Sequence, residues 1–258
     1  MKIRFLSLLA LAFFAFACGD SASTTGEAAA DKAEEMMEEA KEMMAEGAVK
    51  LSPMPATQGF PDAMLKAWTY ENGTFNYTVE NYAFAAQTPD AESLMCANSG
   101  KGQHAHLIVN NEPYMAKYEP TFDVDLPDGT HHIMTFLSRS YHEAIKNGTA
   151  HRAVVAEVKD KSFASVEDIT EPMLFYSRPK GKYTGKANTE NIMLDFYPVN
   201  AELSEEGFYV EAVVNGGEPM KITKWQPYFL TGLPMGENTV KLSLMKDGAL
   251  VEAPLNPV

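Results

Sequence analysis

All six histidines lie between residues 104 and 151, and two of them, His104 and His106, are two positions apart in an apolar segment. Side chains two positions apart on a β-strand point to the same face. His132 lies in a later strand-like segment and adds a third imidazole to that face if both strands belong to one sheet. Three imidazoles suit Zn²⁺ or Cu²⁺, and Cys96 could add a thiolate. These four residues are the predicted metal ligands.

The segment 140–143 (SYHE) brings a hydroxyl and an imidazole close together in sequence. A nucleophilic serine needs a base held against its hydroxyl and an acid that orients the base, and no nucleophile-elbow motif is present. Ser140 followed three residues later by Glu143 is instead typical of a capping box, so we predict a short helix that ends at Gly148. We therefore expect a protein without enzymatic activity.

Arg139 and Arg178 are candidates for binding an anion. Each has serine neighbours, in the segments 137–140 (LSRS) and 176–181 (YSRPKG). A guanidinium beside hydroxyl groups can hold a phosphate or carboxylate through paired hydrogen bonds. The alternative function is therefore a phosphopeptide-binding or peptide-binding module, and the competing interpretation of both arginines is an ordinary surface salt bridge.

An internal repeat indicates the scaffold that positions these residues. Each copy has short strand-like segments separated by Asn, Gly and Pro turns, which predicts a sandwich of immunoglobulin-like kind. We therefore expect an all-β protein with two tandem β-sandwich repeats, at residues 51–165 and 166–258. The matching segments are 104–110 (HAHLIVN) with 209–215 (YVEAVVN), 118–122 (YEPTF) with 225–229 (WQPYF), and 126–129 (LPDG) with 233–236 (LPMG).

The second copy contains no histidine, so the fold does not need them. His104 and His106 occupy the positions of Tyr209 and Glu211, on the face opposite the apolar one. On the later strand, Met134 and Phe136 replace Lys241 and Ser243 on that same outer face. Apolar side chains in these positions predict that the outer face of the first copy is covered or binds something. His131 aligns with Asn238, on the inner side at the start of the later strand.

The N-terminus predicts export. Lys2 and Arg4 precede an apolar run at residues 5–16, which is too short to span a bilayer permanently. Small residues before Cys18 resemble the lipobox of a bacterial lipoprotein, which implies a signal peptide at 1–17 and lipidation of Cys18. Within residues 18–50, the stretch 27–46 is acidic and Met-rich and contains no Gly or Pro, which predicts a helical tether. We expect a lipid-anchored protein of the cell envelope.

The net charge of the chain argues against nucleic acid as a partner. Lys and Arg number 21 and Asp and Glu number 35, which gives a formal net charge of −14. Nucleic-acid binding depends on Lys and Arg that neutralise phosphates, so we expect no nucleic-acid partner. Two cysteines cannot form a disulfide scaffold.

Several segments resemble a family of Bacteroidota lipoproteins: 99–104 (SGKGQH), 136–143 (FLSRSYHE) and 176–181 (YSRPKG). Some members carry the name phosphopeptide-binding protein, and the resemblance supplies no catalytic residue. The sequence as a whole predicts a lipid-anchored envelope protein that binds a transition metal or small ligand through the histidine face. The alternatives are the peptide-binding module and a structural or assembly lipoprotein with a protein partner.

Overall fold

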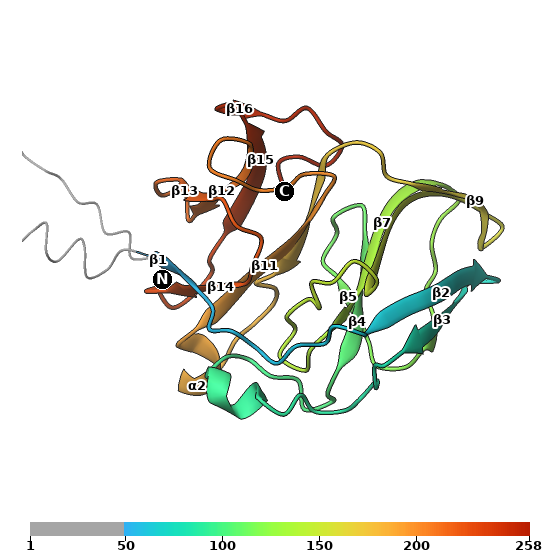
Figure 1. Ribbon diagram of the computed structural model, residues 1–258, viewed down its shortest axis with the longest axis horizontal. Helices are drawn as coiled ribbons and strands as arrows, with labels where there is room; N and C mark the ends of the chain where they lie inside the picture. The colour runs from blue at the N-terminus through green and yellow to red at the C-terminus, as the bar shows by residue number, and fades with distance from the viewer. Residues whose placement is uncertain (1–48) are drawn as a thin grey trace, which may run out of the picture. The chain divides into compact units, whose positions relative to one another are not determined.

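The computed structural model describes residues 49–258, which form an all-β protein of the sandwich type (Figure 1). The predicted signal peptide at 1–17, the lipidated Cys18 and the tether up to residue 48 lie outside the described residues. Every strand pair within residues 49–258 is antiparallel, and the helical elements there are two single turns, η1 (Ala91–Leu94) and α2 (Lys186–Thr189). Neither of these turns has the length or the apolar character to cross a membrane.

The first sandwich packs a three-stranded sheet against a five-stranded sheet. Alternation of apolar and polar residues gives each strand one buried face, and these faces share a core that includes Phe75, Leu107 and Val154. In order, the smaller sheet contains β2 (Met64–Glu71), β3 (Thr74–Glu80) and β6 (Thr121–Asp123), and the larger contains β5 (Met115–Lys117), β4 (His104–Val109), β7 (Gly129–Ser138), β8 (His151–Lys159) and β9 (Ser162–Asp168).

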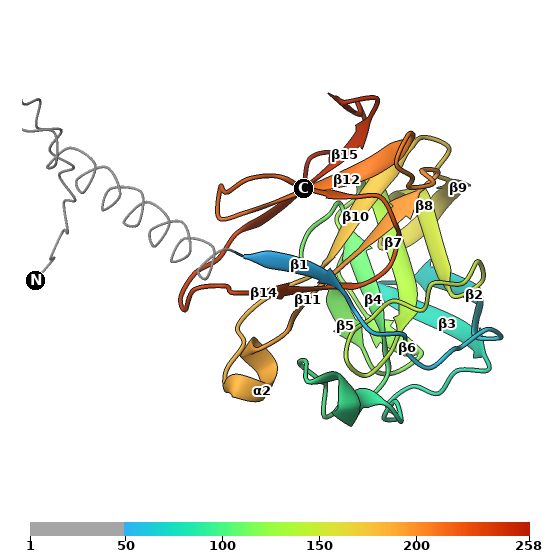
Figure 2. The same cartoon turned by 60° about the vertical axis from the view of Figure 1, so that its left-hand side comes forward.

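The second sandwich packs two four-stranded sheets around a separate core that includes Phe196, Val210 and Leu244. Its first strand, β1, comes from the N-terminal end of the described chain and pairs with β14 at the sheet edge (Figure 2). In order, one sheet contains β1 (Lys50–Pro53), β14 (Tyr228–Thr231), β11 (Ile192–Val199) and β10 (Met173–Arg178), and the other contains β13 (Met220–Ile222), β12 (Phe208–Val214), β15 (Val240–Lys246) and β16 (Ala249–Leu250).

The strands occur in the same order in both sandwiches. The order β5-β4-β7-β8 corresponds to β13-β12-β15-β16, and β2-β3-β6 corresponds to β10-β11-β14. The hairpin turns expected after β4 and β12 are present, with Asn110 and Asn215 in left-handed conformation at φ 52° and 53°. The predicted boundary between residues 165 and 166 falls inside β9. The duplication itself stays a prediction from the sequence.

The outer face of the five-stranded sheet packs against the second sandwich. Ile108 of β4 and Phe136 of β7 belong to one buried cluster with Phe175 of β10 and Tyr197 of β11. Phe136 and Tyr197 stack with ring centroids 5.7 Å apart. The prediction that this face is covered is therefore confirmed, and β10 and β11 are what covers it.

His131 has a structural role in the turn before β7. The side-chain amide of Asn110 donates to His131 Nδ1 at 3.0 Å, and His131 Nε2 donates to the carbonyl of Pro127 at 2.9 Å. The corresponding hydrogen bonds in the second sandwich join Asn215, Asn238 and Pro234. His131 thus braces a turn that an asparagine braces in the other sandwich, as its place on the inner side predicts.

Candidate metal centre

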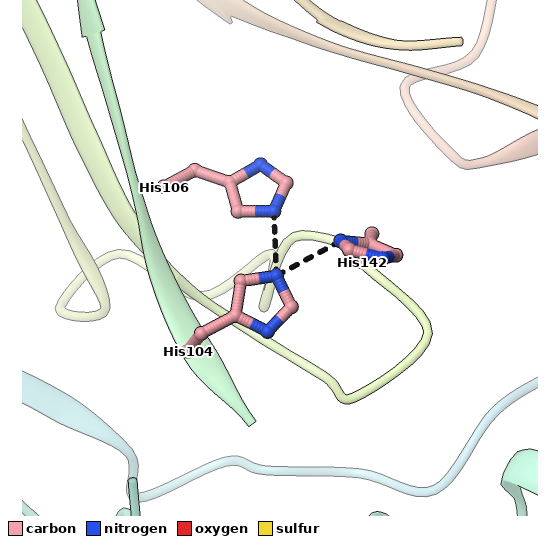
Figure 3. Close-up of side chains that lie close together, drawn as sticks. All are labelled: His104, His106 and His142. Carbon is pink, nitrogen blue, oxygen red and sulfur yellow. Dashed lines mark hydrogen bonds between the residues drawn. The ribbon is translucent and has the colours of Figure 1, made fainter. Parts of the chain in front are cut away.

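Three histidines converge beside the first half of β4 (Figure 3). His104 and His106 project from β4, and His142 reaches them from the loop between β7 and β8. His104 Nε2 lies 3.0 Å from His106 Nε2 and 2.9 Å from His142 Nδ1. One nitrogen from each ring therefore faces a common point, and these three atoms lie within 4.8 Å of one another.

The strand positions of His104 and His106 follow from the alternation of β4. Ala105 and Leu107 enter the core of the first sandwich, so the two histidines must point the other way. Their backbone partners on β7 are Ser138 and Phe136. The second sandwich covers this face, and both imidazoles are therefore fully buried. The prediction that they share a face is confirmed.

His142 lies in a loop, and the predicted helix capped by Ser140 is wrong. Residue 142 has a left-handed backbone with φ 74°, which no helix tolerates in its first turn. The backbone N–H of Ser140 donates to Thr88 Oγ1 at 2.9 Å, and that of Ala144 donates to Asp195 Oδ2 at 2.8 Å. Tertiary partners satisfy the amides that a helix would have used, and the loop turns His142 toward β4.

The hydrogen bonds behind the rings determine which nitrogens carry protons. A carbonyl oxygen only accepts, so His104 Nδ1 donates to the carbonyl of Gly102 at 2.8 Å, and its Nε2 presents a lone pair. His106 Nδ1 lies 3.1 Å from the hydroxyl oxygen of Ser177 on β10. Histidines that bind metals commonly donate their other N–H to a carbonyl or hydroxyl oxygen in this manner.

Burial keeps the cluster neutral. It lowers the pKa of His104 to about 4 and that of His142 to about 2, and it places the pKa of His106 well below its ordinary value. The nearby Arg178 guanidinium also lowers all three pKa values. Neutral imidazole is the form that binds metal ions, so no proton needs to leave these rings at pH 7.

His132 and Cys96 do not join the cluster, which corrects two of the predicted ligands. His132 shares the outward face of β7 but lies four residues before Phe136, the partner of His106, and four residues of strand span about 13 Å. Cys96 packs instead among Tyr141 and other apolar side chains. Burial raises the pKa of its thiol to about 11, which disfavours the thiolate that a metal would bind.

The two candidate anion-binding arginines are both buried. Arg139 Nε lies 3.5 Å from Glu143 Oε2, and its Nη2 donates to the carbonyl of Gln58 at 2.5 Å, so its charge is already paired. Arg178 donates from Nη1 to the hydroxyl oxygen of Tyr114 at 2.7 Å. Neither guanidinium lies on the surface, where a phosphorylated peptide would meet it. Arg139 therefore forms a salt bridge, but inside the protein and not on its surface, and Arg178 forms none within residues 49–258.

Reasoning from the sequence missed His142, Ser177 and Tyr114. Tyr114 stacks on His106 with ring centroids 3.7 Å apart and an angle of 5° between the planes. Its hydroxyl oxygen lies 3.3 Å from His142 Nδ1. The sequence does show that Tyr114 directly precedes β5, and β5 pairs with β4, which carries His104 and His106. The orientation of the Tyr114 side chain, however, depends on tertiary packing.

Comparison with models of protein families, with curated proteins and with solved structures finds no match for this chain. Inference about function therefore starts from the residues of the site. Three neutral imidazoles with one nitrogen each directed at one point form a donor set suited to a borderline transition-metal ion.

Proposed function

We propose that this protein binds one Cu²⁺ or Zn²⁺ ion through His104, His106 and His142. The convergence of three buried imidazole nitrogens on one point is the observation that carries the proposal. His106 and His142 are about equally close to His104 Nε2, and its lone pair can accept a hydrogen bond from only one of them. A metal ion satisfies all three nitrogens at once.

The spacing of the nitrogens supports this proposal. Zn–N bonds of about 2.0–2.1 Å in a tetrahedral site place the ligand nitrogens about 3.3 Å apart. The separations of 3.0 and 2.9 Å need to widen only slightly. Imidazole donors suit copper and zinc, whereas Mg²⁺ and Ca²⁺ select oxygen ligands.

We propose that the role is binding and not catalysis. The strand histidines are fully buried beneath the second sandwich, and of the three ligands His142 alone is partly exposed. This arrangement suits retention of an ion better than exchange of a substrate. Together with the predicted lipid anchor at Cys18, it supports a lipid-anchored envelope protein that holds or delivers a transition metal.

Metal content after exposure to Cu²⁺ or Zn²⁺ and removal of free ions tests the proposal. The purified full chain should retain one ion, measured by mass spectrometry of the elements. The variants His106→Gln and His142→Ala should each lose it. His132→Ala is the matched control, because it removes a histidine of the same sheet that lies outside the cluster, and it should keep the ion. Equal metal content in all four proteins would overturn the proposal.

A further inference from the structure

Arg178 is a buried cation without an anionic partner among residues 49–258. The residue is 4% exposed, and its Nε has no hydrogen-bond partner in that part of the chain. Ion pairs occur elsewhere within residues 49–258, but no carboxylate lies within 4.0 Å of this guanidinium in that range. Burying an unpaired charge is costly, so such a side chain normally faces an anion. Its guanidinium lies over the ring of Tyr183, 5.2 Å from the ring centre, and its Nη1 donates a hydrogen bond to the hydroxyl oxygen of Tyr114 at 2.7 Å.

Tyr114 places that oxygen at the histidine cluster. The residue directly precedes β5, its side chain is buried, and its ring lies parallel to the ring of His106. The hydroxyl oxygen lies 3.3 Å from His142 Nδ1, one of the three converging nitrogens. The Lys180 ammonium, 4.3 Å from the centre of the ring, is a second cation beside the same tyrosine. One phenol thus connects the imidazoles to two positive charges.

We propose that the Tyr114 oxygen is the fourth donor to the metal ion, bound as a phenolate, and that Arg178 is its counter-charge. This inference rests on the proposed function. The metal–oxygen bond forms as the O–H bond breaks, and the proton is released to water. The phenolate then supplies the anion that the buried Arg178 lacks.

The phenolate favours a divalent ion over Cu⁺. An oxygen anion is a hard donor, and three imidazoles with one such oxygen suit Cu²⁺ or Zn²⁺, whereas Cu⁺ prefers soft sulfur ligands.

Tyr118 is a matched control within the same site. Its ring also packs on a histidine of the cluster, with its centre 4.7 Å from that of His104, compared with 3.7 Å between Tyr114 and His106. Its hydroxyl group, however, forms a hydrogen bond of 2.8 Å with Ser99 Oγ. Tyr114→Phe and Tyr118→Phe each remove one hydroxyl oxygen beside the cluster and retain the ring. Only Tyr114→Phe removes the proposed donor.

The test is the visible absorption and resonance Raman spectrum of the full chain loaded with Cu²⁺. The wild type and Tyr118→Phe should show a phenolate-to-copper charge-transfer band with tyrosinate vibrations. Tyr114→Phe should bind copper without either signal. If the wild type binds one copper ion but has the same spectrum as Tyr114→Phe, this inference fails and the proposed function stands. If the wild type binds neither Cu²⁺ nor Zn²⁺, the proposed function fails as well.

Substitution at Arg178 tests the counter-charge. Arg178→Met should lower copper affinity about 10–100-fold, the usual effect of removing a group that supports a ligand. Arg178→Lys retains the positive charge and should recover part of that loss. Circular dichroism of each variant shows whether it has folded. Equal affinity of a folded Arg178→Met protein and the wild type would overturn the role of Arg178.

Discussion

The carboxylate of Asp195, on β11 of the second sandwich, accepts the backbone N–H of Ala144 at 2.8 Å in the loop that carries His142. The same carboxylate forms an ion pair of 2.6 Å with Lys146, and Asp195 is fully buried. Two residues of one loop are thereby attached to the opposite sandwich. The position of His142 over β4 therefore depends on the packing of the two sandwiches against each other.

Asp195→Asn should destabilise the protein by about 3 kcal/mol, because it leaves the largely buried Lys146 without its charge partner. It should also weaken zinc binding, since the loop holds His142 less firmly. Urea unfolding with and without Zn²⁺ measures both effects. The matched control is Asp125→Asn, which breaks an exposed ion pair with Lys161 and should cost less than about 1 kcal/mol. Equal losses for the two variants would contradict the expected anchoring role of Asp195.

The neutral histidines predict how stability depends on pH. Burial lowers the pKa of His104 to about 4 and that of His142 to about 2, below the value of about 6.5 expected in the unfolded chain. The unfolded chain therefore binds more protons, and stability rises with pH. The contribution is complete above about pH 7 and is lost as the pH falls toward 4.

Urea unfolding of the metal-free protein at several values between pH 7 and pH 4 tests this dependence. His142→Gln removes one titrating group, so its stability should fall less steeply with acid than that of the wild type. Comparison of the two slopes separates the histidine from the many carboxylates of this acidic chain. Parallel slopes would show that His142 is not buried in the neutral form.

The strands and their faces could be predicted from the sequence because alternation is a local signal. His104 and His106 share a face as expected, because Ala105 between them enters the core. The position of each residue along the sheet could not be predicted in the same way. The register that pairs His106 with Phe136 depends on backbone contacts between distant segments, and this register excludes His132 from the cluster.

The loop of His142 could not be predicted for a related reason. Ser140 and Glu143 fit a capping box locally. The backbone N–H groups of Ser140 and Ala144, however, donate to Thr88 and Asp195, about 50 residues away in sequence. The local residues favour a helix, but these tertiary hydrogen bonds stabilise the loop instead. Arg139 likewise pairs with Glu143 inside the protein, a contact that the loop itself creates.

Cys96→Ala should leave metal content unchanged, because the thiol packs with Tyr141, Met193 and Phe229 and is not part of the cluster. The variant should lose about 1 kcal/mol of stability through lost packing. Metal analysis and urea unfolding of the loaded protein measure the two quantities. A loss of copper together with a thiolate-to-copper absorption band would restore Cys96 as a ligand.

Ser177→Ala should lower zinc affinity about 10–100-fold, because the hydroxyl is the partner of His106 Nδ1 and orients the ring. Ser243→Ala, a change at a buried serine of β15 in the second sandwich, is the control and should leave affinity unchanged. Competition with a zinc-binding dye measures both. Because Ser177 belongs to β10 and His106 to β4, a specific loss at Ser177 would mean that the two sandwiches build the metal site together. Equal affinity in both variants would mean that β4 orients His106 without this hydrogen bond.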